Sequence, residues 1–311
     1  MTTLGLFVVL LMGFLVTQTD SARGCGSTWP LCHGKLIPAF TIHAMVEWSH
    51  RAVTGVVSVL IVVFSVWAWR RHARRTDVKL LAVVGLAFLV LQGYLGAEAA
   101  LSNPSAAVLA LHFGVSMTAF AGIVLLTALV IQLGGPSGTR REYTVPVGLR
   151  YLVWGILVYM YVVTYVGAYL ARLGTGLSCV GWPLCSGTLI PALTGPVVVP
   201  FLHRVLALGA LILAVVLVVR MRSVRGQRPD LYRGSHWVMG FTLIQALAGG
   251  LLILTRLDIL AVILHVTLAS ILFAALSYLC LQVLPEPFAL RQDSASSGAR
   301  LMDPGAGPAS P

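Results

Sequence analysis

The chain has 311 residues, of which 58% are hydrophobic and 10% are charged, and Asp and Glu together number only 10. Soluble domains usually carry about 25% charged residues, so the composition excludes a water-soluble globular protein and predicts an integral membrane protein. The net charge of +11 would suit a nucleic-acid partner, but the basic residues lie in alternate loops between apolar runs, which is a topology signal and excludes that class.

The apolar residues form eight runs, most of them close to the length of about 20 residues that spans a bilayer. The predicted transmembrane helices cover residues 1–17, 44–69, 80–99, 106–133, 150–170, 197–219, 237–257 and 259–284. Basic residues cluster after the second, fourth and sixth helices. These are Arg70, Arg71, Arg74, Arg75 and Lys79, then Arg140, Arg141 and Arg150, then Arg220, Arg222, Arg225, Arg228 and Arg233. We therefore expect these loops and both termini to be cytoplasmic, and the other loops to face outward from an inner membrane.

The first predicted helix is the shortest, because its uninterrupted apolar part runs only from Leu4 to Val16. A cleaved signal peptide is the alternative, but the segment has no basic n-region. The internal repeat gives it a full-length counterpart at 150–170, so we expect a helix that lacks its first few residues, with a start codon upstream. Residues 286–311 are rich in Ser, Pro, Gly and Ala and predict a disordered cytoplasmic tail.

The chain repeats itself at an offset of 153 residues. The loop from Trp29 to Ala39 recurs from Trp182 to Ala192, with WPLC, Gly and LIPA at the same places. The same offset relates His50-Arg51 to His203-Arg204, Gln92 to Gln245, Gly96 to Gly249, and Leu111-His112 to Leu264-His265. Four helices intervene, so both copies have the same orientation in the membrane. The predicted fold is an all-α membrane protein of two tandem four-helix bundles, residues 1–135 and 136–285, related by a parallel pseudo-two-fold repeat.

Each predicted half carries two histidines near the outer ends of its second and fourth helices: His50 and His112, then His203 and His265. An ionisable residue within a membrane span is a functional candidate by default, although a single histidine often serves only as an interhelical hydrogen bond. Two imidazoles on facing helices suit the two axial positions of a haem iron. Zinc normally takes three or four protein ligands, and copper remains an alternative. The spacing therefore favours one haem site in each half.

The two halves differ in their carboxylates. Glu47 lies three residues before His50, on the same helix face, whereas the repeat places Pro200 at the matching position. A glutamate in a span is costly and is often an acid, a base or a charge stabiliser; a salt bridge to Arg51 is the alternative. We therefore predict chemistry in the first half and a permanent cofactor in the second. Arg51 and Arg204 each follow a histidine, and each suits either a haem propionate or the lipid headgroups.

The outward loops contain two cysteine pairs, Cys25 with Cys32 and Cys179 with Cys185. Outward-facing loops lie in an oxidising compartment where disulfides persist, so the spacing predicts one short-loop disulfide in each half. A pair that cycles between thiol and disulfide is the alternative.

These residues resemble the haem A synthase family of bacteria and mitochondria. The resemblance covers the chain to about Pro285 and rests on the duplicated WPLC-G-LIPA loop, the Glu47-Trp48-Ser49-His50-Arg51 stretch, and the four histidines. It implies an oxidoreductase that converts the ring methyl of haem O to a formyl group, giving haem A for cytochrome oxidase. It further implies that His203 and His265 hold haem b as the resident cofactor and that substrate haem O binds between His50 and His112.

The same resemblance implies that Cys25 and Cys32 contribute to activity and that Cys179 and Cys185 support the cofactor half. As a mechanistic hypothesis, Glu47 steadies the cation left when the methyl loses electrons, or takes a proton from the water that traps it. The expected partners are haem O, a haem O synthase, cytochrome oxidase assembly proteins, membrane lipids and a second copy of the chain.

Two other functions fit parts of the sequence. A two-haem b-type electron-transfer protein would hold both haems permanently, and the carboxylate found only in the first half argues against it. A transporter would suit the parallel repeat, but it requires a midplane site and broken helices, whereas the candidate residues lie near the outer face.

Overall fold

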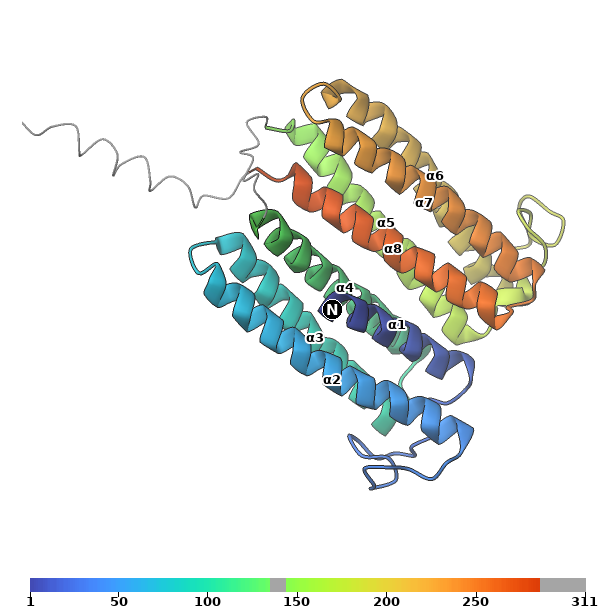
Figure 1. Ribbon diagram of the computed structural model, residues 1–311. Coiled ribbons are helices and arrows are strands. Elements are labelled where there is room, and N and C mark those ends of the chain that lie inside the picture. The colour runs from blue at the N-terminus through green and yellow to red at the C-terminus, as the bar shows by residue number, and fades with distance from the viewer. Residues whose placement is uncertain (135–143, 286–311) are drawn as a thin grey trace, which may run out of the picture.

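The computed structural model describes residues 1–134 and 144–285, and these residues form eight α-helices and contain no β-strand (Figure 1). The helices are α1 (Thr2–Gln18), α2 (Ile42–Arg71), α3 (Thr76–Leu101), α4 (Ala106–Gly134), α5 (Val147–Leu173), α6 (Val198–Met221), α7 (Pro229–Leu254) and α8 (Ile259–Val283). Three short 3-10 turns, η1 (Gly176–Ser178), η2 (Gly195–Val197) and η3 (Arg222–Val224), flank α5 and α6. The predicted Arg140 and Arg141 of the second basic loop, and the predicted tail at 286–311, lie outside the described residues.

Seven of these helices, α2 to α8, are long and apolar enough to cross a membrane. Large aliphatic side chains such as Val56, Val59 and Leu208 are exposed along them, as expected where lipid is the solvent and only helices or closed barrels satisfy the backbone. The prediction of an all-α, multi-pass membrane protein is therefore confirmed. Helix α1 is also apolar, but its 17 residues fall short of a usual span of about 20.

Most helix ends lie within a few residues of the predicted spans, because local signals set them. The side chain of Asp258 accepts the N–H groups of Leu260 and Ala261 and starts α8. Gly174, at φ 65°, ends α5 with the left-handed residue typical of helix C-termini. The largest difference is α7, which begins at Pro229 rather than at residue 237, since the predicted span counted only the apolar part of the helix.

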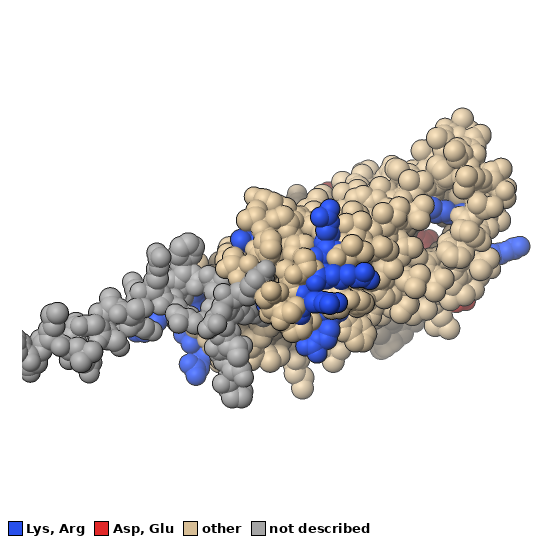
Figure 2. All heavy atoms as spheres, turned by 90° about the horizontal axis from the view of Figure 1, so that it is seen from above, with Lys and Arg blue, Asp and Glu red and all other residues tan. Residues whose placement is uncertain are grey.

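The helices lie side by side in two groups, α1 to α4 and α5 to α8 (Figure 1). The groups meet where α4 packs against α5 and α8, and where α1 packs against α8. The long loops that follow α1 and α5 lie at the same end of the molecule (Figure 1). Figure 2 shows a group of Lys and Arg side chains on one part of the face in view, a few more near the opposite end, and other residues over most of the surface.

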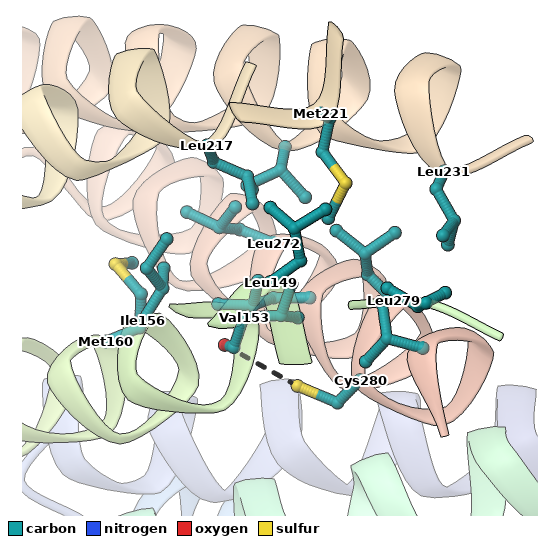
Figure 3. Close-up of a cluster of buried hydrophobic side chains, with 14 of the residues drawn as sticks. Leu149, Val153, Ile156, Met160, Leu217, Met221, Leu231, Leu272, Leu279 and Cys280 are labelled. Atoms are coloured by element: carbon teal, nitrogen blue, oxygen red, sulfur yellow. Dashed lines mark hydrogen bonds between the residues drawn. The ribbon is translucent and has the colours of Figure 1, made fainter. Parts of the chain in front are cut away.

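The largest buried cluster fills the second group. It joins Leu149, Val153 and Ile156 of α5 to Leu217 of α6 and Leu272 of α8 (Figure 3). A second cluster packs α1 against α2, α3 and α4. Helix α4 lies at the centre of the molecule, since 61% of its apolar 18-residue segment is buried, against 22% of the corresponding segment of α2. A third cluster contains Phe273 of α8 and residues of α4 and α5, and it fills the interface between the two groups.

Candidate haem sites

The four predicted histidines lie on four different helices, each within the first three turns: His50 on α2, His112 on α4, His203 on α6 and His265 on α8. All four helices begin at the end of the molecule that carries the long loops (Figure 1). Within each group the two imidazoles lie close enough to interact electrostatically, His112 with His50 and His265 with His203. The structure thus brings together the two histidine pairs that the repeat predicted.

Three of the four imidazoles have a ring nitrogen that no hydrogen bond from the described part of the protein satisfies. The buried Nδ1 atoms of His50, His112 and His203 form no hydrogen bond with any residue that the structure describes. A buried polar atom without a hydrogen-bond partner is energetically costly. Imidazoles with such a nitrogen are therefore suited to bind a ligand or metal that would satisfy it. In residues 1–134 and 144–285, no group of three or more His, Cys, Asp or Glu side chains is placed to hold a metal ion. Two ligands per site suit the axial positions of haem iron better than zinc.

Each histidine also lies against a glycine of the preceding helix. Glycines 13, 96, 167 and 249 lie next to the rings of His50, His112, His203 and His265, in that order. A side chain at Gly13, Gly167 or Gly249 would press on the ring, so the space for these three imidazoles depends on its absence, whereas a Cβ at Gly96 would make an ordinary contact. The sequence repeat marked Gly96 and Gly249 only as matching positions, and it did not mark Gly13 and Gly167.

A glutamine lies near the histidines in both groups, but its partners differ. Nε2 of Gln245 lies 3.3 Å from Nδ1 and 3.2 Å from Nε2 of His265. In the first group, Oε1 of Gln92 instead accepts the hydroxyl of Ser116 at 3.0 Å. The repeat places Ala269 at the position of Ser116. Among the described residues, His265 is the only one of the four histidines whose ring has a side-chain hydrogen-bond partner.

The predicted cysteine pairs are at bonding distance, with Sγ atoms 2.05 Å apart for Cys25–Cys32 and 2.02 Å apart for Cys179–Cys185. All four residues are buried. Each disulfide closes a tight turn in which the second cysteine pairs with the residue three positions on, Cys32 with Lys35 and Cys185 with Thr188. The free thiol of Cys280 lies in the apolar core of the second group, where it donates to the carbonyl of Val153 at 3.7 Å (Figure 3).

Glu47 is buried, with 4% of its surface exposed, and it ties the first loop to α2. Its Oε1 accepts Nη2 of Arg51 at 2.5 Å, and its Oε2 accepts the backbone N–H of Cys25 at 2.8 Å. The salt bridge that the sequence offered as an alternative to chemistry is therefore present. The contact with Cys25 adds a direct connection between the carboxylate and the first disulfide.

Arg51 and Arg204 hold the disulfide loops, a role that sequence analysis did not foresee. Nη1 of Arg51 donates to the carbonyls of Thr28 at 2.7 Å and Leu31 at 2.9 Å. Arg204 donates through Nη1 to the carbonyl of Leu184 at 2.8 Å and through Nη2 to that of Cys179 at 2.5 Å. The second group has Pro200 where the first has Glu47. Nη2 of Arg204 therefore donates to the carbonyl of Cys179, whereas Nη2 of Arg51 donates to the carboxylate of Glu47.

A cleft of about 440 Å³ lies between the first disulfide loop and the turn that joins α3 to α4. Arg23 and Ser27 line one side, and Ser102 and Asn103 line the other. Arg23 crosses it and donates to the carbonyl of Ser102 at 3.4 Å. The cleft is lined by none of the four histidines, so it is separate from the candidate haem sites.

Comparison with known proteins relates the chain to a single family. Residues 39–277 match the model of the COX15-CtaA family, described as cytochrome oxidase assembly protein. The chain is 38% identical over 287 residues to a protein named heme A synthase from Alkalihalophilus pseudofirmus, covering 89% of this chain and 93% of that protein.

Two further proteins with the same name give similar values. That from Symbiobacterium thermophilum is 41% identical over 90% of this chain and 92% of its own length. That from Halalkalibacterium halodurans is 36% identical over 90% and 93%. The matched residues 39–277 include the second disulfide loop and all four histidines, and the chain belongs to the COX15-CtaA family of cytochrome oxidase assembly proteins.

Proposed function

We infer that this chain is a haem A synthase, an oxidoreductase that converts haem O to haem A. Relatives of that name align along nearly their whole length. The structural observation that carries the inference is the pair of histidines that each helix group brings together. Three of these four histidines have a buried Nδ1 with no hydrogen-bond partner among the described residues, and only the first group has a buried carboxylate near its pair.

We propose that His203 and His265 are the axial ligands of a resident haem b, and that substrate haem O binds between His50 and His112. When bound, haem b supplies electron-transfer chemistry. The absence of a third ligand in either site supports this assignment for the described residues. The contact of Gln245 with His265 also supports it, because partners that hold a ligating imidazole orient its ring.

Glu47 is the proposed catalytic carboxylate. Both of its oxygens are held, one by Arg51 and one by the N–H of Cys25, so its position is fixed on the helix that carries His50. A carboxylate in this place can stabilise positive charge that develops on the substrate, and it can accept a proton from an attacking water through a lone pair that remains.

The remaining N–H groups of Arg51 and Arg204 are the donors that we propose for haem propionates, since each guanidinium has five and the loops use only some of them. We propose that Cys25–Cys32 contributes to activity through its bond to Glu47, and that Cys179–Cys185 supports the cofactor half. A direct thiol–disulfide cycle remains the alternative for the first pair.

We further propose that α1 also crosses the membrane, giving eight spans in two tandem halves, residues 1–135 and 136–285, related by a pseudo-two-fold axis. The packing of α1 against α2 and α4 supports this. Both termini and the basic turns would be cytoplasmic and the disulfide loops extracytoplasmic, in line with the positive-inside rule. A haem O synthase, oxidase assembly proteins and a second copy of the chain are the proposed partners.

The test is to express the chain with a haem O synthase in a bacterium that makes no haem A, purify it, and identify its extracted haems by chromatography and mass. Haem A or hydroxylated haem O beside haem B supports the proposal. Two equivalents of haem B with no product would indicate an electron carrier instead, and a chain without haem would refute the assignment of the histidines.

A matched pair of variants sharpens this test. His112→Ala is expected to abolish conversion, while His236→Ala, which changes an exposed histidine on α7, should convert haem O as the wild type does.

A further inference from the structure

Each of the four membrane histidines packs against a glycine on the helix that precedes its own. An ideal Cβ built on Gly167 of α5 would lie 2.8 Å from Cε1 of His203, and one on Gly249 of α7 would lie 3.2 Å from Cε1 of His265. In the first group the corresponding distances are 3.0 Å from Gly13 of α1 to His50 and 3.4 Å from Gly96 of α3 to His112.

The four contacts recur although the spacing of the sequence changes. Gly96 and Gly249 are 153 residues apart, like the histidines, but Gly13 and Gly167 are 154 apart. The extra residue lies in the disulfide loops, since Cys25 and Cys32 are separated by 7 positions and Cys179 and Cys185 by 6. The first disulfide loop is thus one residue longer than the second, and the glycines before and after it still lie opposite the histidines in both helix groups.

The contact falls on the chemically important edge of the imidazole. Cε1 lies between the two ring nitrogens, and for Gly167 the added Cβ would also lie 3.3 Å from both Nδ1 and Nε2 of His203. A histidine has few ways to yield, because it is attached to a packed helix and its ring is planar. A methyl group at the glycine would therefore tilt or displace the two atoms that can bind a metal.

Close packing of helices accounts for some glycines, such as Gly5 against Val57 and Gly250 against Trp182, but not every glycine of these helices is in close contact. Gly93 of α3, Gly155 of α5 and Gly240 of α7 lie in the same three helices as three of the glycines in question, and an added Cβ there would meet nothing within 4 Å. For Gly13 and Gly167, the added Cβ would also lie within 4 Å of an unpartnered Nδ1, that of His50 and that of His203.

We propose that Gly13, Gly167 and Gly249 are positioning residues that set the imidazole on the next helix at the angle required for haem ligation, while Gly96 is at ordinary contact distance from its histidine. This inference rests on the proposed haem sites. The distances give an order for the effect of a Gly→Ala change, with Gly167 the most sensitive, then Gly13, then Gly249, and Gly96 the least.

The test compares Gly167→Ala and Gly249→Ala with the matched controls Gly155→Ala and Gly240→Ala, which add the same methyl group to the same two helices. The measurements are haem b per purified chain and the low-spin ferric electron paramagnetic resonance spectrum, which depends on the orientation of the axial imidazoles. We expect about tenfold weaker haem retention in Gly167→Ala, the usual order of cost for one overpacked methyl group. A smaller loss or a shifted spectrum is expected in Gly249→Ala.

Gly13→Ala provides a second arm, because it should leave haem b content unchanged while lowering the conversion of haem O. The proposal is overturned if Gly167→Ala and Gly249→Ala keep as much haem b as their controls Gly155→Ala and Gly240→Ala, or if these controls lose as much haem b as the two test variants. If Gly167→Ala does not fold, Gly249→Ala decides the question alone. A wild-type chain without haem would instead refute the proposed function, so the two failures are distinguishable.

Discussion

Replacing Glu47 should release the first disulfide loop from α2 and leave the second loop untouched. In the wild type, the carboxylate accepts Nη2 of Arg51 at 2.5 Å and the N–H of Cys25 at 2.8 Å. Glu47→Ala removes both bonds. Glu47→Gln keeps an amide oxygen for the N–H of Cys25 and removes only the charge that pairs with Arg51.

The size of the effect follows from the burial of the pair, whose side chains are 6% and 12% exposed. A hydrogen bond to a charged group contributes about 1.5–3 kcal/mol. Of the two bonds, only the one from the N–H of Cys25 joins the loop to α2, because Arg51 lies on α2 itself. The free energy of opening the loop should therefore fall by about 1.5–3 kcal/mol in Glu47→Ala and by less in Glu47→Gln. Since 1.4 kcal/mol corresponds to a factor of about ten, the alanine variant should open its loop about 10- to 150-fold more often, and the glutamine variant should show a smaller increase.

The assay is the rate at which each disulfide is reduced and alkylated under mild reductant, with the two loops separated by peptide mass. Cys25 and Cys32 are fully buried, so their reaction reports loop opening. Cys179–Cys185 is an internal control, because Pro200 stands where Glu47 would be. Equal acceleration of both disulfides, or no acceleration of Cys25–Cys32, would show that Glu47 does not hold the loop. Full conversion of haem O by Glu47→Gln would end its proposed catalytic role.

Three further outcomes follow from the same structure. His203→Ala should lose haem b while His50→Ala retains it, as measured by the pyridine haemochrome per chain, and retention in both would contradict the division of roles between the halves. Arg228→Ala should destabilise the fold more than Arg75→Ala in denaturation of the detergent-solubilised protein. Arg228 is 5% exposed and donates to the carbonyl of Gln282 as well as to Asp230, whereas Arg75 is more exposed. Leu217→Ala should cost about 2–5 kcal/mol by the same measurement, because this side chain is fully buried, and a cost near zero would mean that the second core is loosely packed.

The class, the positions of the helices and the cysteine pairs were accessible from the sequence, because each depends on a local signal. Apolar runs and basic loops mark spans wherever they occur, and a cysteine six or seven positions from another in an outward loop has few other partners. Glu47 and Arg51 are four residues apart on one helix, so their ion pair was also visible as an alternative. What the sequence did not predict was the N–H of Cys25 as a second partner, since that depends on the path of an irregular loop.

The contacts between helices were the least predictable part. In a membrane most faces of a helix are apolar, so hydrophobic periodicity does not reveal which face meets a neighbour. Gly13 and Gly167 were missed for this reason, and also because they repeat at 154 rather than 153 residues. The role of Arg51 and Arg204 in holding loop carbonyls was hidden in the same way, because backbone acceptors leave no trace in a sequence pattern.

The central place of α4 has a consequence for how the protein is made. Helix α4 is packed on one side by α3, which is synthesised just before it, and on the other by α5 and α8. Of the eight described helices, α8 leaves the ribosome last, so during synthesis the face of α4 that it covers stays in contact with lipid until α8 inserts. A chain cut short before Ile259 would therefore expose the faces of α4, α5 and α7 together, so insertion of α8 completes the second helix group and its contact with the first in one step.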